Sequence, residues 1–161
     1  MNKIQKSTDK TEKSIQVQCL ALMAKSIGNK LAPYLQAIIP ELQSLMMQLD
    51  ENSPEDDANE LSEACLTTIA TIIRRCARSV SPFVDSLLEN SFKLISYDPN
   101  YLYNDDEDEE MKDDDDDEGW GSDVEPDSED MGDDEDSSWK VRRGAINVIE
   151  SVIKTRPDLL N

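Results

Sequence analysis

The chain contains no histidine. Because histidine is the commonest general base and the commonest zinc ligand, its absence removes the usual centre of both kinds of site. The sequence also has no glycine-rich phosphate-binding loop and no nucleophile-elbow motif. We therefore expect no enzyme activity, no catalytic or cofactor-binding residue and no metal site.

Long apolar runs and a secretory signal are also missing. No stretch approaches the ~18 consecutive apolar residues that a membrane-spanning helix needs, and residues 1–13 are polar and lysine-rich. The three cysteines, Cys19, Cys65 and Cys76, show no C-x-x-C spacing and lie within apolar helical patterns. Buried reduced thiols suit a reducing compartment, so we expect a cytoplasmic or nuclear protein whose partners include neither a membrane nor a nucleic acid.

What the chain does have is a concentrated negative charge. Residues 105–136 hold 21 acidic residues and one basic residue, Lys112, so their net charge is −20. This value equals the formal net charge of the whole chain. The rest of the sequence is neutral as a group. Because like charges repel and the tract offers almost no apolar surface, we expect a disordered acidic loop over residues 98–137.

One spacing within this acidic tract matches a calcium-binding loop. Positions 1, 3, 5, 6 and 12 of that template are occupied by Asp114, Asp116, Glu118, Gly119 and Glu125. Pro126 follows directly, no helix flanks the match, and chance matches are expected in so acidic a stretch. We therefore interpret the tract as a solvated spacer or as a surface that binds basic proteins.

The sequence before the tract shows apolar residues at helical spacing. We predict a first helix that ends at Gly28-Asn29 and carries Cys19, Leu20, Met23 and Ile27 on one apolar face. A second helix begins near Pro33 and carries a longer apolar stripe of Leu35, Ile38, Ile39, Leu42, Leu45, Met46 and Leu49. Pro40 lies inside this second helix and should kink it or cost it a hydrogen bond.

The same arrangement follows in residues 54–97. Ser53 is the expected cap of a helix whose apolar stripe consists of Leu61, Cys65, Leu66, Ile69, Ile72, Ile73 and Cys76. Arg74, Arg75 and Arg78 crowd the end of that helix, where cations complement its dipole. A second helix begins near Pro82 and carries Val84, Leu87, Leu88, Ser91 and Ile95.

These two helix pairs align with each other. Residues 31–35 match residues 80–84 at an offset of 49, and Cys19-Leu20 matches Cys65-Leu66 at an offset of 46. A period close to ~40–47 residues is typical of HEAT and armadillo repeats, so the pattern predicts an all-α helical-repeat solenoid. After the tract, Ser137 or Ser138 should cap a further helix that Pro157 ends, with an apolar face of Trp139, Val141, Ala145, Val148, Ile149 and Val152.

The chain therefore divides into five expected segments. These are a flexible polar N-terminus (1–13), two HEAT-like repeats (14–50 and 54–97), the disordered acidic loop (98–137) and the first helix of an incomplete repeat (138–161). A helix pair buries its apolar faces only against its neighbours, and about three repeats are the usual minimum. We interpret the sequence as an excerpt from a longer solenoid.

One pair of motifs carries a family resemblance. The segment Tyr97-Asp98-Pro99-Asn100-Tyr101, then an acidic stretch, then residues 138–143 (Ser-Trp-Lys-Val-Arg-Arg) resembles the cullin-associated neddylation-dissociated family. The segments Ile38-Ile39-Pro40 and Arg74-Arg75-Cys76 resemble its repeats in the same order. The resemblance covers roughly residues 14–158. The sequence departs from the family by about three missing residues around Gly28 to Leu31.

The resemblance implies a function in ubiquitin conjugation. Family members are all-HEAT-repeat proteins that wrap cullin–RING scaffolds lacking the ubiquitin-like modification, exchange substrate-receptor modules and are not enzymes. It therefore implies a non-catalytic segment that binds a cullin–RING ligase scaffold of the SCF type and regulates its assembly. Two alternatives remain open: a chaperone-like binder of basic proteins that acts through the acidic tract, or an inactive truncated copy.

Overall fold

The computed structural model describes residues 10–49, 56–98 and 137–159. Within these ranges the chain forms no strand and five α-helices: α2 (Lys10–Ile27), α3 (Leu35–Met46), α4 (Asp56–Arg75), α5 (Val84–Ile95) and α6 (Ser138–Thr155). Three short 3-10 helices are η1 (Gly28–Tyr34), η2 (Ser81–Phe83) and η4 (Pro157–Leu159). The predicted all-α helical-repeat fold is confirmed.

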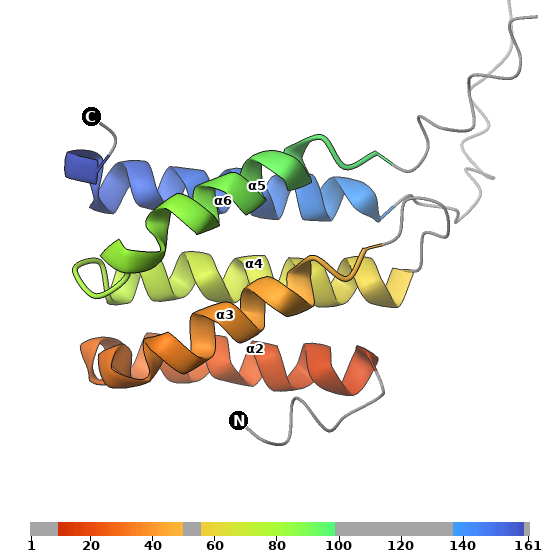
Figure 1. Cartoon of the computed structure of the whole chain (residues 1–161). Helices are drawn as coiled ribbons and strands as arrows, with labels where there is room; N and C mark the ends of the chain where they lie inside the picture. The colour runs from red at the N-terminus through yellow and green to blue at the C-terminus, as the bar shows by residue number, and fades with distance from the viewer. Residues whose placement is uncertain (1–9, 50–55, 99–136, 160–161) are drawn as a thin grey trace, which may run out of the picture.

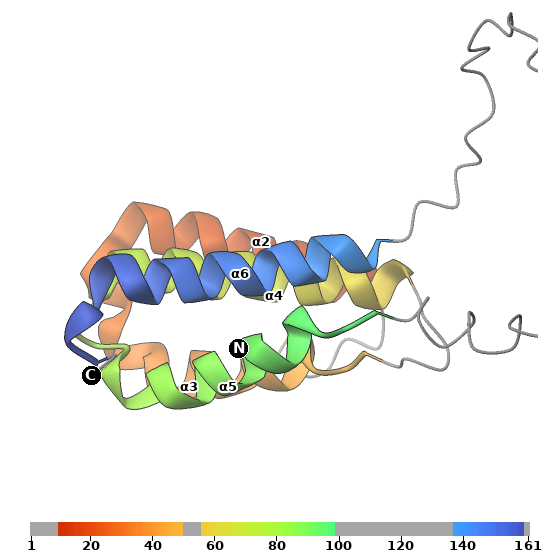
Figure 2. The same cartoon turned by 90° about the horizontal axis from the view of Figure 1, so that it is seen from above.

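The helices lie in two layers. Helices α2, α4 and α6 run side by side in one layer, and α3 and α5 cross over them in a second layer (Figures 1 and 2). Helix α4 occupies the centre, because it packs against α2 on one side, against α6 on the other and against α3 in the second layer. The first-layer helices α2 and α4 are each followed by a second-layer helix, which is the helix-pair pattern that the internal match predicted.

The apolar stripe of α4 forms the middle of the core. All seven side chains predicted for this stripe, from Leu61 to Cys76, are at most 1% exposed. The predicted faces of the neighbouring helices are also largely buried, as shown by Leu35, Ile39 and Leu42 in α3 and by Val84 and Leu87 in α5. A helix in the middle of an array buries apolar residues on several sides, so its stripe is broad and easily recognised in the sequence.

The apolar face predicted for α2 is not the face that this helix buries most deeply. The residues that α2 buries are Ser14, Val17, Ala21 and Ala24, whereas Met23 is 54% exposed and Cys19 is also exposed. Small side chains let α2 approach α4 closely, and the Thr68 hydroxyl of α4 donates a hydrogen bond to the Val17 carbonyl at 3.2 Å. Larger apolar residues dominate a pattern of hydrophobicity, so the sequence favoured the other side of the helix.

The turns between first-layer and second-layer helices differ between the two repeats. Helix α2 ends at Ile27, and η1 begins directly at Gly28, whose φ of 54° lies in the left-handed region that glycine adopts without strain. Helix α4 is followed by the turn 76–80 before η2 begins. Leu31 and Val80 nevertheless both point into the core, at 3% and 0% exposure. The shorter first turn therefore preserves the packing of its repeat.

Several predicted helix boundaries can be compared with the structure. Helix α6 ends two residues before Pro157, as predicted, and α3 continues through the exposed Pro40. Ser137 precedes α6, but its side chain makes no capping hydrogen bond, so the expected side-chain cap is wrong. Ser53, the calcium-loop match and the acidic tract lie outside the described residues, and α2 already begins at Lys10.

Candidate interaction surface

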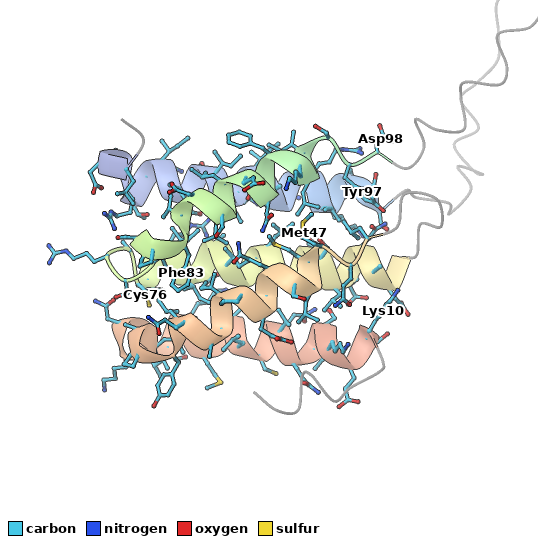
Figure 3. The ribbon with its side chains drawn as sticks, viewed as in Figure 1. Lys10, Met47, Cys76, Phe83, Tyr97 and Asp98 are labelled. Atoms are coloured by element: carbon cyan, nitrogen blue, oxygen red, sulfur yellow. The ribbon has the colours of Figure 1, made fainter. Side chains whose placement is uncertain are left out.

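Two arginines, Arg142 within α6 and Arg156 directly after it, fasten this helix to the second repeat. At the start of α6, Arg142 Nη1 donates hydrogen bonds to the Tyr97 carbonyl and to Ser138 Oγ, both at 2.9 Å. The same guanidinium lies 3.8 Å from the Asp98 carboxylate. Figure 3 labels Tyr97 and Asp98 at the end of α5, beside the first turns of α6. The fold thus brings together the two motifs that carry the family resemblance.

The second arginine, Arg156, acts at the opposite end of α6. Its Nη1 donates to the Ala77 carbonyl at 3.0 Å and also to Ser81 Oγ, both in the segment that joins α4 to α5. Its Nε and Nη2 donate to the carboxylate of Asp158. This hydrogen bonding lowers the pKa of Asp158 and raises the pKa of Arg156. The helix is therefore held at both ends by charge-assisted hydrogen bonds to backbone carbonyls.

A third link joins the first-layer helices. The Asn59 amide of α4 donates a 2.8 Å hydrogen bond to Ser137 Oγ, just before α6. On the other side of α4, Ser14 Oγ of α2 donates a hydrogen bond to the Glu60 carboxylate of α4 at 3.2 Å. Both links lie near the N-terminal ends of the helices that they join. Sequence reasoning assigned Ser137 to a cap and gave Asn59 and Ser14 no role.

The outer face of α6 carries exposed apolar side chains. Trp139, Ile146 and Ile153 are 40%, 54% and 52% exposed and follow one another at intervals of seven residues, which places them along one line of the helix. The Trp139 ring lies 5.9 Å from both Lys140 Nζ and the Arg143 guanidinium carbon. An aromatic ring flanked by two cations can contact a partner that offers both apolar and acidic groups.

A second exposed apolar surface lies at the other end of the array. A groove of about 470 Å³ opens between α2 and α3. We call it the α2–α3 groove and define it by Cys19, Leu20, Met23, Ile27, Tyr34 and Ile38. Its four residues from α2 are those of the predicted apolar face. They form an apolar face, as predicted, but no described element of the chain covers it.

The cysteines divide between surface and core. Cys65 and Cys76 are buried free thiols, as expected, whereas Cys19 is exposed, which corrects the expectation that all three are buried. Burial, and secondarily the carboxylate of Glu41, raises the pKa of Cys65 to about 12. Burial also raises the pKa of Cys76. A protonated thiol is a poor nucleophile, so neither buried cysteine suits catalysis at neutral pH.

Metal and membrane sites were searched for in residues 10–49, 56–98 and 137–159. Within these ranges, no group of three or more Cys, Asp or Glu side chains is arranged to hold a metal ion. None of the helices in the same ranges is both long enough and apolar enough to cross a membrane.

Comparison with known proteins gives a consistent group of relatives. The chain is 35% identical over 144 residues to "Cullin-associated NEDD8-dissociated protein 1" of Drosophila melanogaster, and 35% identical over 144 residues to "Cullin-associated NEDD8-dissociated protein 2" of Mus musculus. The Dictyostelium discoideum protein 1 is 32% identical over 152 residues. The chain resembles a fragment of the cullin-associated NEDD8-dissociated proteins. No protein-family model matches it.

The matched region covers most of this chain but only a small part of each relative. The aligned region covers 89% of this chain but only 11% of the Drosophila and mouse proteins and 12% of the Dictyostelium protein. The chain therefore corresponds to about a tenth of the length of its curated relatives. The resemblance to cullin-associated NEDD8-dissociated proteins that the two motifs indicated is confirmed.

Proposed function

We propose that this chain is a non-catalytic, protein-binding helical-repeat segment that contacts the scaffold of cullin–RING (SCF-type) ubiquitin ligases. In this role it takes part in regulating ligase assembly and substrate-receptor exchange. The observation that carries the proposal is the similarity of 89% of the chain to proteins named for their association with cullins. The absence of histidine fits a binding role better than an enzymatic one.

The geometry supports binding through the helices. The helix pairs α2–α3 and α4–α5 and the helix α6 form successive units of one array, and part of the outer face of α6 is exposed. The exposed line of Trp139, Ile146 and Ile153 offers a rigid apolar strip with Lys140 and Arg143 beside it. Aromatic residues and arginine are enriched at the centres of protein interfaces. The proposed setting is the cytoplasm or the nucleus, where cullin–RING ligases act.

The direct test is a binding measurement with purified components. The chain is immobilised and its affinity is measured for a cullin–RING complex that lacks NEDD8 and for the same complex carrying NEDD8. The proposal predicts saturable binding to the unmodified complex and at least about tenfold weaker binding to the modified one, roughly 1.4 kcal/mol in free energy of binding. A helical, monomeric chain that binds neither complex would contradict the proposal and would favour an inactive truncated copy.

A further inference from the structure

Positive charge gathers along one edge of the array. The three first-layer helices run in the same direction, so α2, α4 and α6 all end at this edge (Figure 1). The segments that follow them lie in contact, because Cys76 Sγ donates a hydrogen bond to the Gly28 carbonyl at 3.4 Å and Arg156 Nη1 donates to the Ala77 carbonyl at 3.0 Å. We call this surface the cationic edge and define it by seven basic side chains: Lys25, Lys30, Arg74, Arg75, Arg78, Lys154 and Arg156.

The charge of the cationic edge exceeds what the helix ends require. The three segments that form the edge contain these seven basic residues and one acidic residue, Asp158: residues 25–34, 74–83 and 154–159. A helix C-terminus carries about −0.5 elementary charge and an N-terminus about +0.5. Because three first-layer helices end here and α3 and α5 begin here, their dipoles together contribute only about −0.5 elementary charge. The excess of positive charge remains when Asp85 in the first turn of α5 and Glu150 of α6 are included.

Two of the seven cations already bind carboxylates. Arg156 donates from Nε and Nη2 to the two carboxylate oxygens of Asp158, at 2.9 and 2.7 Å. Lys154 Nζ lies 2.6 Å from the Glu150 carboxylate. Hydrogen bonding to Lys154 lowers the pKa of Glu150, and the charge of Arg74 in the neighbouring helix also contributes. The acceptor at this edge is a carboxylate in both pairs.

Four further cations of the edge are exposed and available. Among the residues that the structure describes, no ion pair involves these four side chains: Lys25, Lys30, Arg75 and Arg78. A hollow of about 450 Å³ between the α4–α5 turn and the end of α6 has Arg78 in its wall. Asp158 also lines the hollow, but Arg156 engages both of its oxygens. The hollow therefore leaves room beside Arg78 for a further acidic side chain.

We propose that the cationic edge binds an acidic segment of a partner protein. Packed helices lie about 8–10 Å apart, so the three rows of cations extend over about 20 Å. An extended peptide covers this distance with about six residues, and its carboxylates pair with the cations that lack a partner. The edge runs along the turns of the repeats and not over the faces on which further repeats would stack. This binding is independent of the proposed contact with a cullin–RING scaffold.

A nucleic acid fits the cationic edge less well. Residues 105–136 give the chain its net charge of −20, which repels a long polyanion, whereas a short acidic peptide contacts the edge alone. Sites for single-stranded nucleic acids also stack bases on several aromatic rings. In the three segments of the edge, Tyr34 is the one large aromatic side chain that is exposed.

The test uses a fluorescently labelled octaglutamate peptide, and its binding to the full chain is followed by anisotropy at about 0.1 M salt. We expect saturable binding that Arg75→Glu and Arg78→Glu each weaken at least about fivefold, because each reverses one charge of the edge. The matched control is Lys93→Glu, which changes the net charge equally but lies in the last turn of α5. Helix α5 is about 18 Å long, more than the Debye length of about 10 Å, so this control should change the affinity less than about twofold.

Circular dichroism checks that the three variants keep the helical fold. No saturation at about 1 mM peptide, or equal losses in the edge and control variants, would overturn the proposal. Tighter binding of a single-stranded DNA octanucleotide than of the peptide would also overturn it, because the edge would then be assigned to nucleic acid. So would peptide binding that occurs only after deletion of residues 105–136, because the chain's own acidic tract would then be the occupant.

Discussion

The burial of an individual side chain depends on the position of its helix in the array, as Ile69 illustrates. This side chain lies in the middle of α4 and is 0% exposed. Removing buried methyl and methylene groups costs the transfer free energy and leaves a cavity. The sequence pattern predicted this burial correctly, because α4 has neighbours on several sides.

We predict that Ile69→Ala lowers the free energy of unfolding by about 2–5 kcal/mol. Ile146→Ala, at a 54% exposed site of α6, is the matched control and should change stability by less than about 0.5 kcal/mol. Urea denaturation followed by circular dichroism measures both changes. Equal unfolding midpoints for the two variants would show that Ile69 is not part of the core.

The cysteines provide a residue-scale prediction about pH. Because burial raises the pKa of Cys65 to about 12, the unfolded chain loses this thiol proton before the folded chain does. The stabilisation of the folded state by the neutral thiol is thus complete below the ordinary thiol pKa of 9.0 and falls as the pH rises toward 12. Cys19 is exposed, so thiol reagents reach it directly, whereas they do not reach the buried Cys65.

We expect an aromatic disulfide reagent at pH 8 to modify one thiol quickly and the other two only after denaturation. The variant Cys19→Ser should remove the fast phase, whereas Cys65→Ser should leave it unchanged. Absorbance of the released thiolate gives both rates. Three equally fast thiols in the native chain would contradict the burial of Cys65 and Cys76.

At the scale of elements, α6 is fixed to the second repeat by specific hydrogen bonds. Arg142 provides a test of this attachment. Its side chain is 30% exposed, and it donates a hydrogen bond to the backbone carbonyl of Tyr97, 45 residues away in the sequence. We predict that Arg142→Ala destabilises the chain by about 1–2 kcal/mol, the lower part of the range for charged donors because the site is partly exposed.

The neighbouring Arg143 is the control for this prediction. It is exposed and contacts only the Trp139 ring in the described interactions, so Arg143→Ala should cost less than about 0.5 kcal/mol. Hydrogen exchange adds a local readout, because Arg142→Ala should speed exchange in the first turns of α6 more than in α4. Identical exchange in the two variants would show that Arg142 does not anchor the helix.

The sequence predicted most elements but missed how one helix is oriented. The repeats, the broad stripe of α4 and the end of α6 before Pro157 follow from spacing, glycine and proline. The burial of Ser14, Ala21 and Ala24 in α2 could not be read from hydrophobicity, because small and polar side chains are buried there by close helix approach. Arg142 stood within a motif, but its partner at Tyr97 is 45 residues away and only the fold brings them together.

At the scale of the whole molecule, two regions compete as the binding element. The helices offer ordered apolar and cationic surfaces, and residues 105–136 carry the net charge of −20. Binding through exposed charges weakens steeply with salt, because the Debye length is only about 8–10 Å near physiological ionic strength. Binding through packed helix surfaces depends on salt much less.

The most direct measurement is therefore the affinity for an unmodified cullin–RING complex with and without residues 105–136, at two salt concentrations. A basic protein measured under the same conditions reports on binding through the acidic tract. Our account predicts that the deletion changes cullin–RING affinity by no more than a few-fold at either salt concentration. Loss of cullin–RING binding on deletion would contradict it and would assign the interaction to the acidic tract.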